Sequence, residues 1–305
     1  MSINNTSAKI IIIIALTFTV TSASAVLPII SQVKRPTRSD HRVGIALSGG
    51  GALGFAHIGA LQALNEHGIY PDCIAGTSMG SIIGVMYAAG YTPLEILEIV
   101  RTDKLYKMKR LLTLQSAIST LGMSRHDALH SILLKYIPHN SFDSLQIPFT
   151  VCVTNFDSVR AEYRSGGGQL SEYVVASSSI PGVFEALNIN GTTYVDGGVM
   201  DNLPSRSLKH YGCQYIIGVD VLPVVQNARK TNAIDIAVTS LRTMQHINSL
   251  PGIEACNWLI DSYALTSYHE LSFEQYREIY QIGYQATIEY LRTHPDLINS
   301  TTILM

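Results

Sequence analysis

The stretch Gly76–Gly80, with the sequence Gly-Thr-Ser-Met-Gly, constrains the fold of this 305-residue chain more than any other feature. It follows the apolar run Cys73–Ala75 and precedes the apolar run 82–89, a pattern that predicts a strand, a sharp turn and a helix. Glycines two positions before and two after Ser78 give such a turn the clearance it needs. Ser78 is then placed at a helix N-terminus, where unpaired backbone N–H groups favour negative charge. A serine that only caps the helix is the simpler alternative.

Two further glycine-rich turns follow predicted strands in the same way. The apolar run 43–47 leads into Gly49, Gly50, Gly51 and Gly54, and a helical pattern follows over 55–67. The run 192–195 leads into Asp196, Gly197 and Gly198. Strands that alternate with helices predict an α/β fold, with a mostly parallel central sheet in three layers, α/β/α. In such a sheet all three turns lie at the carboxyl edge, where ligands bind.

Other parts of the chain carry further strand and helix signals. The β-branched run 149–154 predicts a central strand, and 160–164 predicts an edge or hairpin strand. The runs 187–189 and 192–195 flank Asn190-Gly191, which predicts a hairpin. Residues 94–140, and most of the chain after 235, have helical patterns.

Composition excludes one class of partner and limits the cysteine chemistry. The formal net charge is −2 and only 14% of residues are charged, so we expect no nucleic-acid partner. The four cysteines are far apart and form no Cys-x-x-Cys pair. We therefore expect buried thiols, and neither a metal site nor a disulfide framework. The cysteines are Cys73, Cys152, Cys213 and Cys256.

The N-terminus has the pattern of an export signal. Lys9 precedes the apolar run 10–20, and an Ala-x-Ala sequence ends at Ala25. This predicts a signal peptide over 1–25, a linker over 26–41, one domain over 42–305, and an exported protein, periplasmic or secreted. An uncleaved membrane anchor is the alternative, because moderately apolar residues continue to Ile30.

The three turns carry the candidate chemistry. Ser78 is a candidate nucleophile, and Asp196 is a candidate base that accepts its proton. The backbone amides of Gly49, Gly50 and Gly51 are candidate donors for the oxyanion that forms when a serine attacks a carbonyl, because glycine leaves the approach open.

Two alternatives remain for these residues. The glycine loop also fits a dinucleotide phosphate, although the next strand ends in Gly76–Ser78 rather than in an acidic residue. A Ser-His-Asp triad is the rival to a Ser78–Asp196 pair. None of the candidate histidines follows a strand in a glycine-rich turn; they are His210, His246, His269 and His294. We expect His57 to pack against the glycine loop.

Four blocks in this order resemble the patatin-like phospholipase family: Ser48–Leu61, Gly76–Gly80, Ser177–Phe184 and Asp196–Pro204. The resemblance implies a patatin-like α/β/α fold and an acyl hydrolase that uses a Ser–Asp dyad without a cofactor. By position it implies Ser78 as nucleophile, Asp196 as proton acceptor and the loop from Gly49 to Gly54 as oxyanion hole. Leu53 departs from the family, where Arg or Lys is usual; because the oxyanion donors are backbone groups, we expect activity to survive without the basic residue.

We therefore expect a serine hydrolase of phospholipids or lysophospholipids that acts in lipid metabolism or degradation, with a lipid substrate and no metal. The segment Lys104–Leu112 interleaves basic and apolar residues, and can rest on a membrane surface or be an ordinary solvated helix. A nucleotide-binding module and a catalytically silent lipid-binding protein are the alternatives. Oligomeric state is left open.

Overall fold

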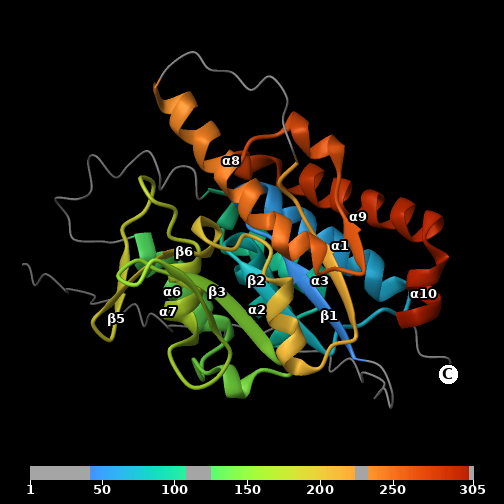
Figure 1. Cartoon of the computed structure of the whole chain (residues 1–305), viewed down its shortest axis with the longest axis horizontal. Helices are drawn as coiled ribbons and strands as arrows, with labels where there is room; N and C mark the ends of the chain where they lie inside the picture. The colour runs from blue at the N-terminus through green and yellow to red at the C-terminus, as the bar shows by residue number, and fades with distance from the viewer. Residues whose placement is uncertain (1–41, 108–124, 224–232, 302–305) are drawn as a thin grey trace, which may run out of the picture.

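Eight strands form one sheet at the centre of the computed structural model, which describes residues 42–107, 125–223 and 233–301 (Figure 1). The strand order is β5-β6-β3-β2-β1-β7-β8, and β4 pairs with β3 beside this path. The strands are β1 (Val43–Leu47), β2 (Cys73–Thr77), β3 (Phe149–Asn155), β4 (Arg160–Arg164), β5 (Leu187–Ile189), β6 (Thr192–Asp196), β7 (Tyr215–Val219) and β8 (Trp258–Ile260).

Helices connect and cover these strands. The α-helices are α1 (Ala56–Glu66), α2 (Met79–Ala88), α3 (Pro93–Thr102), α6 (Arg125–Tyr136), α7 (Leu170–Ser177), α8 (Ala233–Glu254), α9 (Tyr276–Thr293) and α10 (Pro295–Thr301). The 3-10 helices are η1 (Gly51–Phe55), η2 (Leu105–Lys107), η3 (Phe142–Ser144), η4 (Gly197–Val199), η5 (Ser205–Tyr211), η6 (Tyr263–Ser267) and η7 (Phe273–Gln275).

The centre of the sheet is parallel and one side of it is antiparallel. β1 pairs in parallel with β2 and β7, and parallel pairing continues to β3 and β8. β3 then pairs antiparallel with β4 and β6, and β5 and β6 form the hairpin predicted around Asn190-Gly191. The prediction of a mostly parallel sheet with the run 149–154 in a central strand is confirmed.

The two faces of the sheet carry cores of very different size. Ile45, Leu47 and Ile74 point into the larger core, which includes side chains of α1, α2, α3, α7 and α9. Ala46 and Ala75 point to the opposite face, where η5 and the end of α8 cover a smaller core. Because alternate residues of a strand face opposite sides, β1, β2 and β7 contribute to both cores. The predicted three layers, α/β/α, are confirmed (Figure 1).

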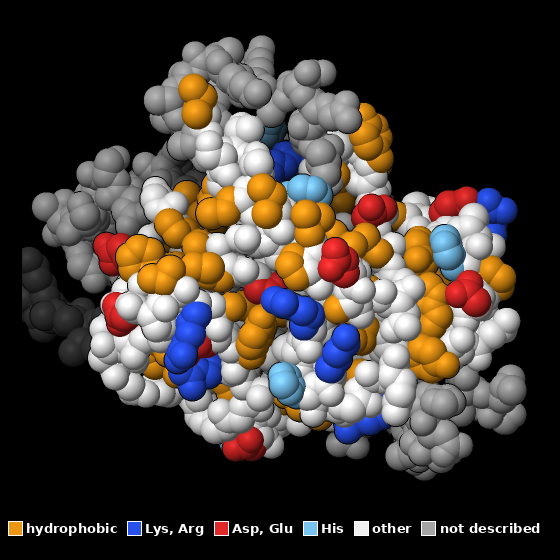
Figure 2. Space-filling view, in the orientation of Figure 1, with side chains coloured by type: hydrophobic (Ala, Val, Ile, Leu, Met, Phe, Trp, Pro, Cys, Tyr) orange, Lys and Arg blue, Asp and Glu red, His pale blue; other side chains and the backbone are white. Residues whose placement is uncertain are grey.

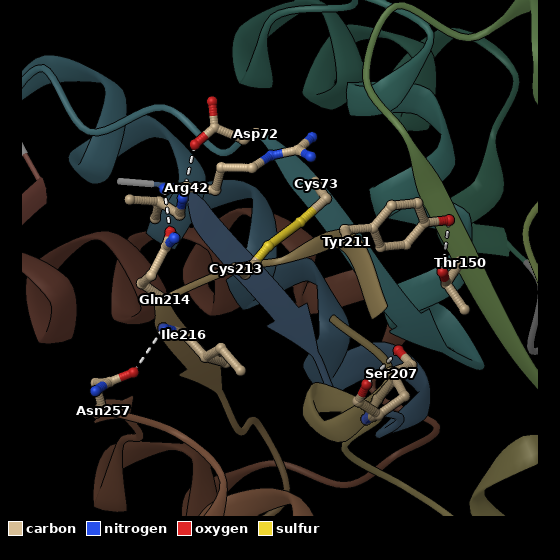
Figure 3. Close-up of a disulfide and its surroundings, with 12 residues drawn as sticks. Arg42, Asp72, Cys73, Thr150, Ser207, Tyr211, Cys213, Gln214, Ile216 and Asn257 are labelled. Carbon is tan, nitrogen blue, oxygen red and sulfur yellow. Dashed lines mark hydrogen bonds between the residues drawn. A yellow bond between two sulfur atoms is a disulfide. The ribbon is translucent and has the colours of Figure 1, made fainter. Parts of the chain in front are cut away.

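A disulfide lies in the smaller core. Cys73, at the start of β2, is bonded to Cys213, which precedes β7 (Figure 3). The expectation that the cysteines stay unpaired is wrong for these two residues. β2 and β7 lie on either side of β1, and Gly44 of β1 leaves room between them, since a Cβ there would lie 3.1 Å from the Cys213 sulfur. Cys152 and Cys256 are free thiols.

The chain after residue 235 contains one strand that the helical pattern does not predict. β8 has only three residues and pairs with β7, so its short apolar run resembles a turn of helix in the sequence. The described part of 94–140 is helical over α3, η2 and α6. Residues 1–41, and Met108–Leu112 of the basic and apolar segment, lie outside the described residues.

Candidate functional site

Ser78 lies in a sharp turn between β2 and α2, as predicted. Its backbone has φ 52° and ψ −125°, a conformation that residues other than glycine rarely adopt. A Cβ at Gly76 would lie 2.5 Å from the Gly80 carbonyl oxygen, and one at Gly80 would lie 2.4 Å from the Leu47 carbonyl oxygen. Both positions therefore exclude any side chain, which confirms the reason given for the two glycines.

The backbone amide of Ser78 is held by a second serine. Ser177 Oγ accepts a hydrogen bond from the Ser78 N–H at 2.9 Å and donates one to the Cys152 carbonyl oxygen at 2.6 Å. Ser177 is the last residue of α7 and is completely buried. The sequence placed it in a motif but assigned it no role, because this contact joins residues 99 positions apart. Ser177 thus stabilises the unusual backbone of the turn.

The register of the sheet brings Asp196 level with Ser78. Thr77, the residue before Ser78, is paired with Cys152 of β3, and Asp196 is paired with Val153, one residue further along the same strand. Ser78 and Asp196 therefore lie at the same level on either side of β3. A Cβ at Gly197 would lie 2.3 Å from the Cys152 carbonyl oxygen, so the chain after Asp196 passes close over β3.

Asp196 is a buried carboxyl group with one oxygen left open. Oδ1 accepts a hydrogen bond from the Gly198 N–H at 2.8 Å. Oδ2 is buried and makes no hydrogen bond of ordinary geometry with any residue that the structure describes. Burial raises the pKa of Asp196 from 3.8 to about 7, although the neighbouring Ser78 hydroxyl and the Gly198 N–H lower it. The carboxyl group is therefore balanced between its acid and base forms near neutral pH.

The glycine loop borders Ser78 and offers two open amides. A Cβ at Gly49 would lie 3.1 Å from the Ser78 Cβ, so the loop contacts the turn directly. The Gly49 N–H already donates to the Asn202 carbonyl oxygen at 3.1 Å. The N–H groups of Gly50 and Gly51 make no hydrogen bond within the described ranges. The loop as described therefore has Gly50 and Gly51 as its open donors.

Gly54 and Leu53 have packing roles in the same loop. A Cβ at Gly54 would lie 2.3 Å from the Met79 Cγ, so glycine lets the loop sit against the residue after Ser78. Leu53, at the position where the family usually has a basic residue, is completely buried in the larger core. A charged side chain there would need a partner in that core.

His57 anchors the glycine loop from inside the protein, as expected. Burial lowers the pKa of His57 to about 4, so the ring is neutral at physiological pH. Its Nε2 donates a hydrogen bond to the Ser48 carbonyl oxygen at 2.8 Å. Ser48 Oγ in turn accepts one from the Val221 N–H at 3.0 Å. These bonds fix the start of the loop from two sides.

The four histidine candidates for a triad make no hydrogen bond to Ser78 in the described part of the chain. His210 and His269 are exposed, and His246 and His294 are half-buried. His294 stacks on Tyr290 at a ring distance of 4.0 Å. Over the described ranges, no histidine makes a hydrogen bond to Ser78 or Asp196. This arrangement favours the pair over the Ser-His-Asp triad.

Comparison with known proteins places the chain in a family. The family model described as "Patatin-like phospholipase" matches residues 45–209. Lysophospholipase NTE1 of Kluyveromyces lactis is 29% identical over 291 residues, covering 84% of this chain and 20% of the relative. Lysophospholipase NTE1 of Coccidioides immitis is 31% identical over 284 residues, covering 82% of this chain and 17% of the relative. The chain thus spans about a fifth of the length of these relatives.

Among solved structures, VipD from Legionella pneumophila is similar to this chain. The two share 16% sequence identity with a TM-score of 0.46, and the match covers 85% of this chain and 68% of VipD.

The prediction of an exported protein, periplasmic or secreted, is wrong. The chain matches fungal proteins named lysophospholipase NTE1 over more than three quarters of its length, and this relationship contradicts export. The export prediction depended on residues 1–25 alone, and these lie outside the described residues. Across 42–107, 125–223 and 233–301, every helix is too short or too polar to cross a lipid bilayer.

The family match begins at Ile45 in β1 and ends at Lys209 in η5. It includes the glycine loop, the turn at Ser78, Ser177 and Asp196, while Val221, which bonds to Ser48, lies beyond its end. The match covers more than half of the chain and supports the predicted enzyme class, a carboxylic ester hydrolase. This chain belongs to the patatin-like phospholipase family.

Proposed function

We propose that this protein hydrolyses acyl esters of phospholipids or lysophospholipids through an acyl-enzyme intermediate on Ser78. The observation that carries the proposal is the juxtaposition of Ser78 with the buried carboxyl group of Asp196, beside a loop with two open amides. Family membership and relatives named lysophospholipases support a lipid substrate.

In the acylation step, Asp196 accepts the Ser78 hydroxyl proton while Ser78 Oγ forms a bond to the ester carbonyl carbon. The carbonyl electrons move to the oxygen, and the Gly50 and Gly51 N–H groups stabilise the resulting negative charge. When the tetrahedral intermediate collapses, the C–O bond to the leaving alcohol breaks. Protonated Asp196 then returns the proton to that alcohol.

Deacylation repeats the same steps with water. Asp196 accepts a proton from the attacking water, and the oxyanion forms again at the two amides. Collapse of this second intermediate releases the fatty acid, and the proton on Asp196 returns to Ser78 Oγ. A folded-state pKa of about 7 suits both halves of the cycle, because the group has to accept and return a proton near neutral pH.

Fatty acid release from lysophosphatidylcholine tests the proposal. We expect turnover by the unmodified protein, and a loss of at least about 1,000-fold in Ser78→Ala and Asp196→Asn. His246→Ala is the matched control, because it removes a half-buried histidine outside the pair. Loss of turnover in the histidine variant, with its fold intact, would favour a triad over the pair. Full turnover in Ser78→Ala would exclude Ser78 as the nucleophile.

A further inference from the structure

The hairpin between β3 and β4 extends past the proposed active site. Val153 of β3 is level with Asp196, and β3 continues for two more residues before the turn over 156–159. At about 3.3 Å per residue, the turn begins about 10 Å beyond the level of Ser78. Phe156 donates its N–H to the Thr193 carbonyl oxygen at 2.9 Å, and Asp157 Oδ2 accepts the Thr193 N–H at 2.9 Å. The turn is therefore fixed against β6.

Two large apolar side chains lie exposed on this turn. Phe156 is 61% exposed and Val159 is 69% exposed. Hydrophobic side chains also gather on the surface around β6 and α8 (Figure 2). Single exposed apolar residues are common on protein surfaces, but two on one four-residue turn beside an active site form a defined apolar tip.

The backbone conformation at position 159 does not favour a valine. Val159 has φ 52°, a conformation that is strained for a β-branched residue. Asn190, in the turn between β5 and β6, has the same φ of 52° and is a residue type that adopts this conformation readily. Asparagine or glycine would suit position 159 better for folding alone. A valine there indicates a use for the exposed apolar side chain.

The charges of the hairpin cancel one another. Glu162 lies 3.2 Å from Arg160 and 2.6 Å from Arg164, and Asp157 provides a second negative charge. The hairpin over 156–164 therefore carries two positive and two negative groups. A neutral hairpin with an apolar tip suits insertion into an uncharged lipid surface better than attraction to an anionic one.

We propose that this tip, Phe156 and Val159, inserts into the interfacial region of a lipid bilayer and brings the Ser78 site to the lipid surface. The inference rests on the proposed function, because a hydrolase of phospholipid or lysophospholipid esters must reach substrates held in a bilayer. The tip is separate from the segment Lys104–Leu112, and it needs no anionic lipid.

Flotation with phosphatidylcholine vesicles tests this proposal in the full-length protein. We expect the double variant Phe156→Ser/Val159→Asn to bind these vesicles at least about tenfold more weakly than the unmodified protein, since both apolar groups are lost. Val159→Asn also relieves the positive φ, so the double variant should fold. Its turnover of a soluble substrate, p-nitrophenyl butyrate, should stay within about twofold of the unmodified protein.

Leu94→Ser is the matched control. Leu94 is 55% exposed on α3, which follows α2 at the opposite edge of the sheet. The Ala88 carbonyl at the end of α2 accepts the N–H groups of Gln146 and Ile147, just before β3 begins. This variant should bind vesicles as the unmodified protein does.

Four results would overturn the proposal. These are no vesicle binding by the unmodified protein, equal binding by the double variant, an equal loss in Leu94→Ser, and binding that requires phosphatidylserine. The last would indicate electrostatic attraction in place of insertion. Failure of the proposed function is a separate outcome, because it would abolish turnover of p-nitrophenyl butyrate in every variant while vesicle flotation still decides the role of the tip.

Discussion

Asp196 and Asp201 lie five residues apart, and each residue is about 1% exposed, yet their surroundings differ. Asp201 Oδ2 accepts a hydrogen bond from the Tyr163 hydroxyl at 2.6 Å and lies 3.8 Å from the Arg206 guanidinium. Asp196 has no cation within ion-pair distance in the described chain. Its Oδ2 accepts no hydrogen bond of ordinary geometry there.

The pKa values of the two groups reflect these surroundings. Burial is the largest influence on both, and it raises the pKa of Asp196 to about 7 and that of Asp201 to about 6. Tyr163 and Arg206 lower the pKa of Asp201, whereas Asp196 is lowered only by the Ser78 hydroxyl and the Gly198 N–H. Burial and an unbonded oxygen do not by themselves identify a base, because Asp201 Oδ1 is also buried without a hydrogen bond among the described residues. What sets Asp196 apart is that its neighbour is the Ser78 hydroxyl and that it has no ion-pair partner there.

The largest expected effect is a difference between the two asparagine variants. Asp196→Asn should lower kcat for a soluble ester by at least about 1,000-fold, because the variant cannot accept the Ser78 proton. Asp201→Asn should lower kcat by less than about tenfold, because Asp201 stabilises the fold through its contacts with Tyr163 and Arg206. Steady-state kinetics of both variants, with circular dichroism to check folding, measures this difference. Equal losses would mean that the two carboxyl groups do not have separate roles.

Ser177 tests how much the position of Ser78 contributes to the function of the Ser78–Asp196 pair, because its hydroxyl accepts the Ser78 N–H. Ser177→Ala leaves the Ser78 N–H without an acceptor, and we expect kcat to fall about 10- to 100-fold with KM little changed. Ser178→Ala is the control, since among the described residues the Ser178 hydroxyl bonds to carbonyl groups of α7, on its own side of the turn. If both variants lose the same activity, the effect belongs to the loop in general and not to the Ser78 amide.

The pH dependence of kcat/KM distinguishes titration of Asp196 from titration of Asp201. The base form of Asp196 is required, so kcat/KM should fall about tenfold for each pH unit below 7 and level off above it. Asp201→Asn should keep this profile. A profile in Asp201→Asn that levels off at a clearly different pH would assign the titration to Asp201.

Stability should depend on Asp196 in the opposite direction from activity. Its folded-state pKa of about 7 exceeds the ordinary value of 3.8, so the folded protein binds the proton more tightly than the unfolded chain does. The free energy of unfolding therefore falls as pH rises from about 4 to 7. Asp196→Asn removes this charge and should be more stable than the unmodified protein at pH 8 by up to about 4 kcal/mol, since each of the roughly three units of pKa difference corresponds to about 1.4 kcal/mol. Urea unfolding at pH 5 and pH 8 measures the change, which should be less than half as large at pH 5, because the unfolded chain already releases the Asp196 proton above about pH 4.

The smallest expected effect on activity comes from a change beside Asp201, whose carboxylate is bonded to Tyr163. Tyr163→Phe removes the donor to Asp201 Oδ2 and should lower the free energy of unfolding by about 1–2 kcal/mol at pH 8. Activity should change by less than about threefold. A large loss of activity without loss of stability would place Tyr163 and Asp201 in the reaction itself.

Local features of the site could be predicted from the sequence. The turn at Ser78 follows from two glycines at fixed spacing between apolar runs, and their clearance in the structure is the clearance the spacing implies. The position of Asp196 at the end of β6 could be predicted because the hairpin has its own Asn190-Gly191 turn. The order of strands and helices likewise indicated the layered α/β fold.

Features that depend on distant contacts could not be predicted. Ser177 accepts a hydrogen bond from Ser78, 99 positions away in the sequence. The Gly49 N–H donates one to the carbonyl of Asn202, 153 positions away. The Cys73–Cys213 bond requires knowing that β2 and β7 both lie beside β1, which no cysteine spacing reveals. Residue type and spacing carry no information on these pairings.

The rate at which a fluorophosphonate labels Ser78, measured from pH 5 to pH 9, tests the role of Asp196 most directly. For the unmodified protein and for Asp201→Asn, we predict a rate that rises with an apparent pKa near 7 and then levels off. For Asp196→Asn, we predict slow labelling that does not depend on pH. Labelling of Asp196→Asn as fast as that of the unmodified protein would contradict the proposed Ser78–Asp196 pair.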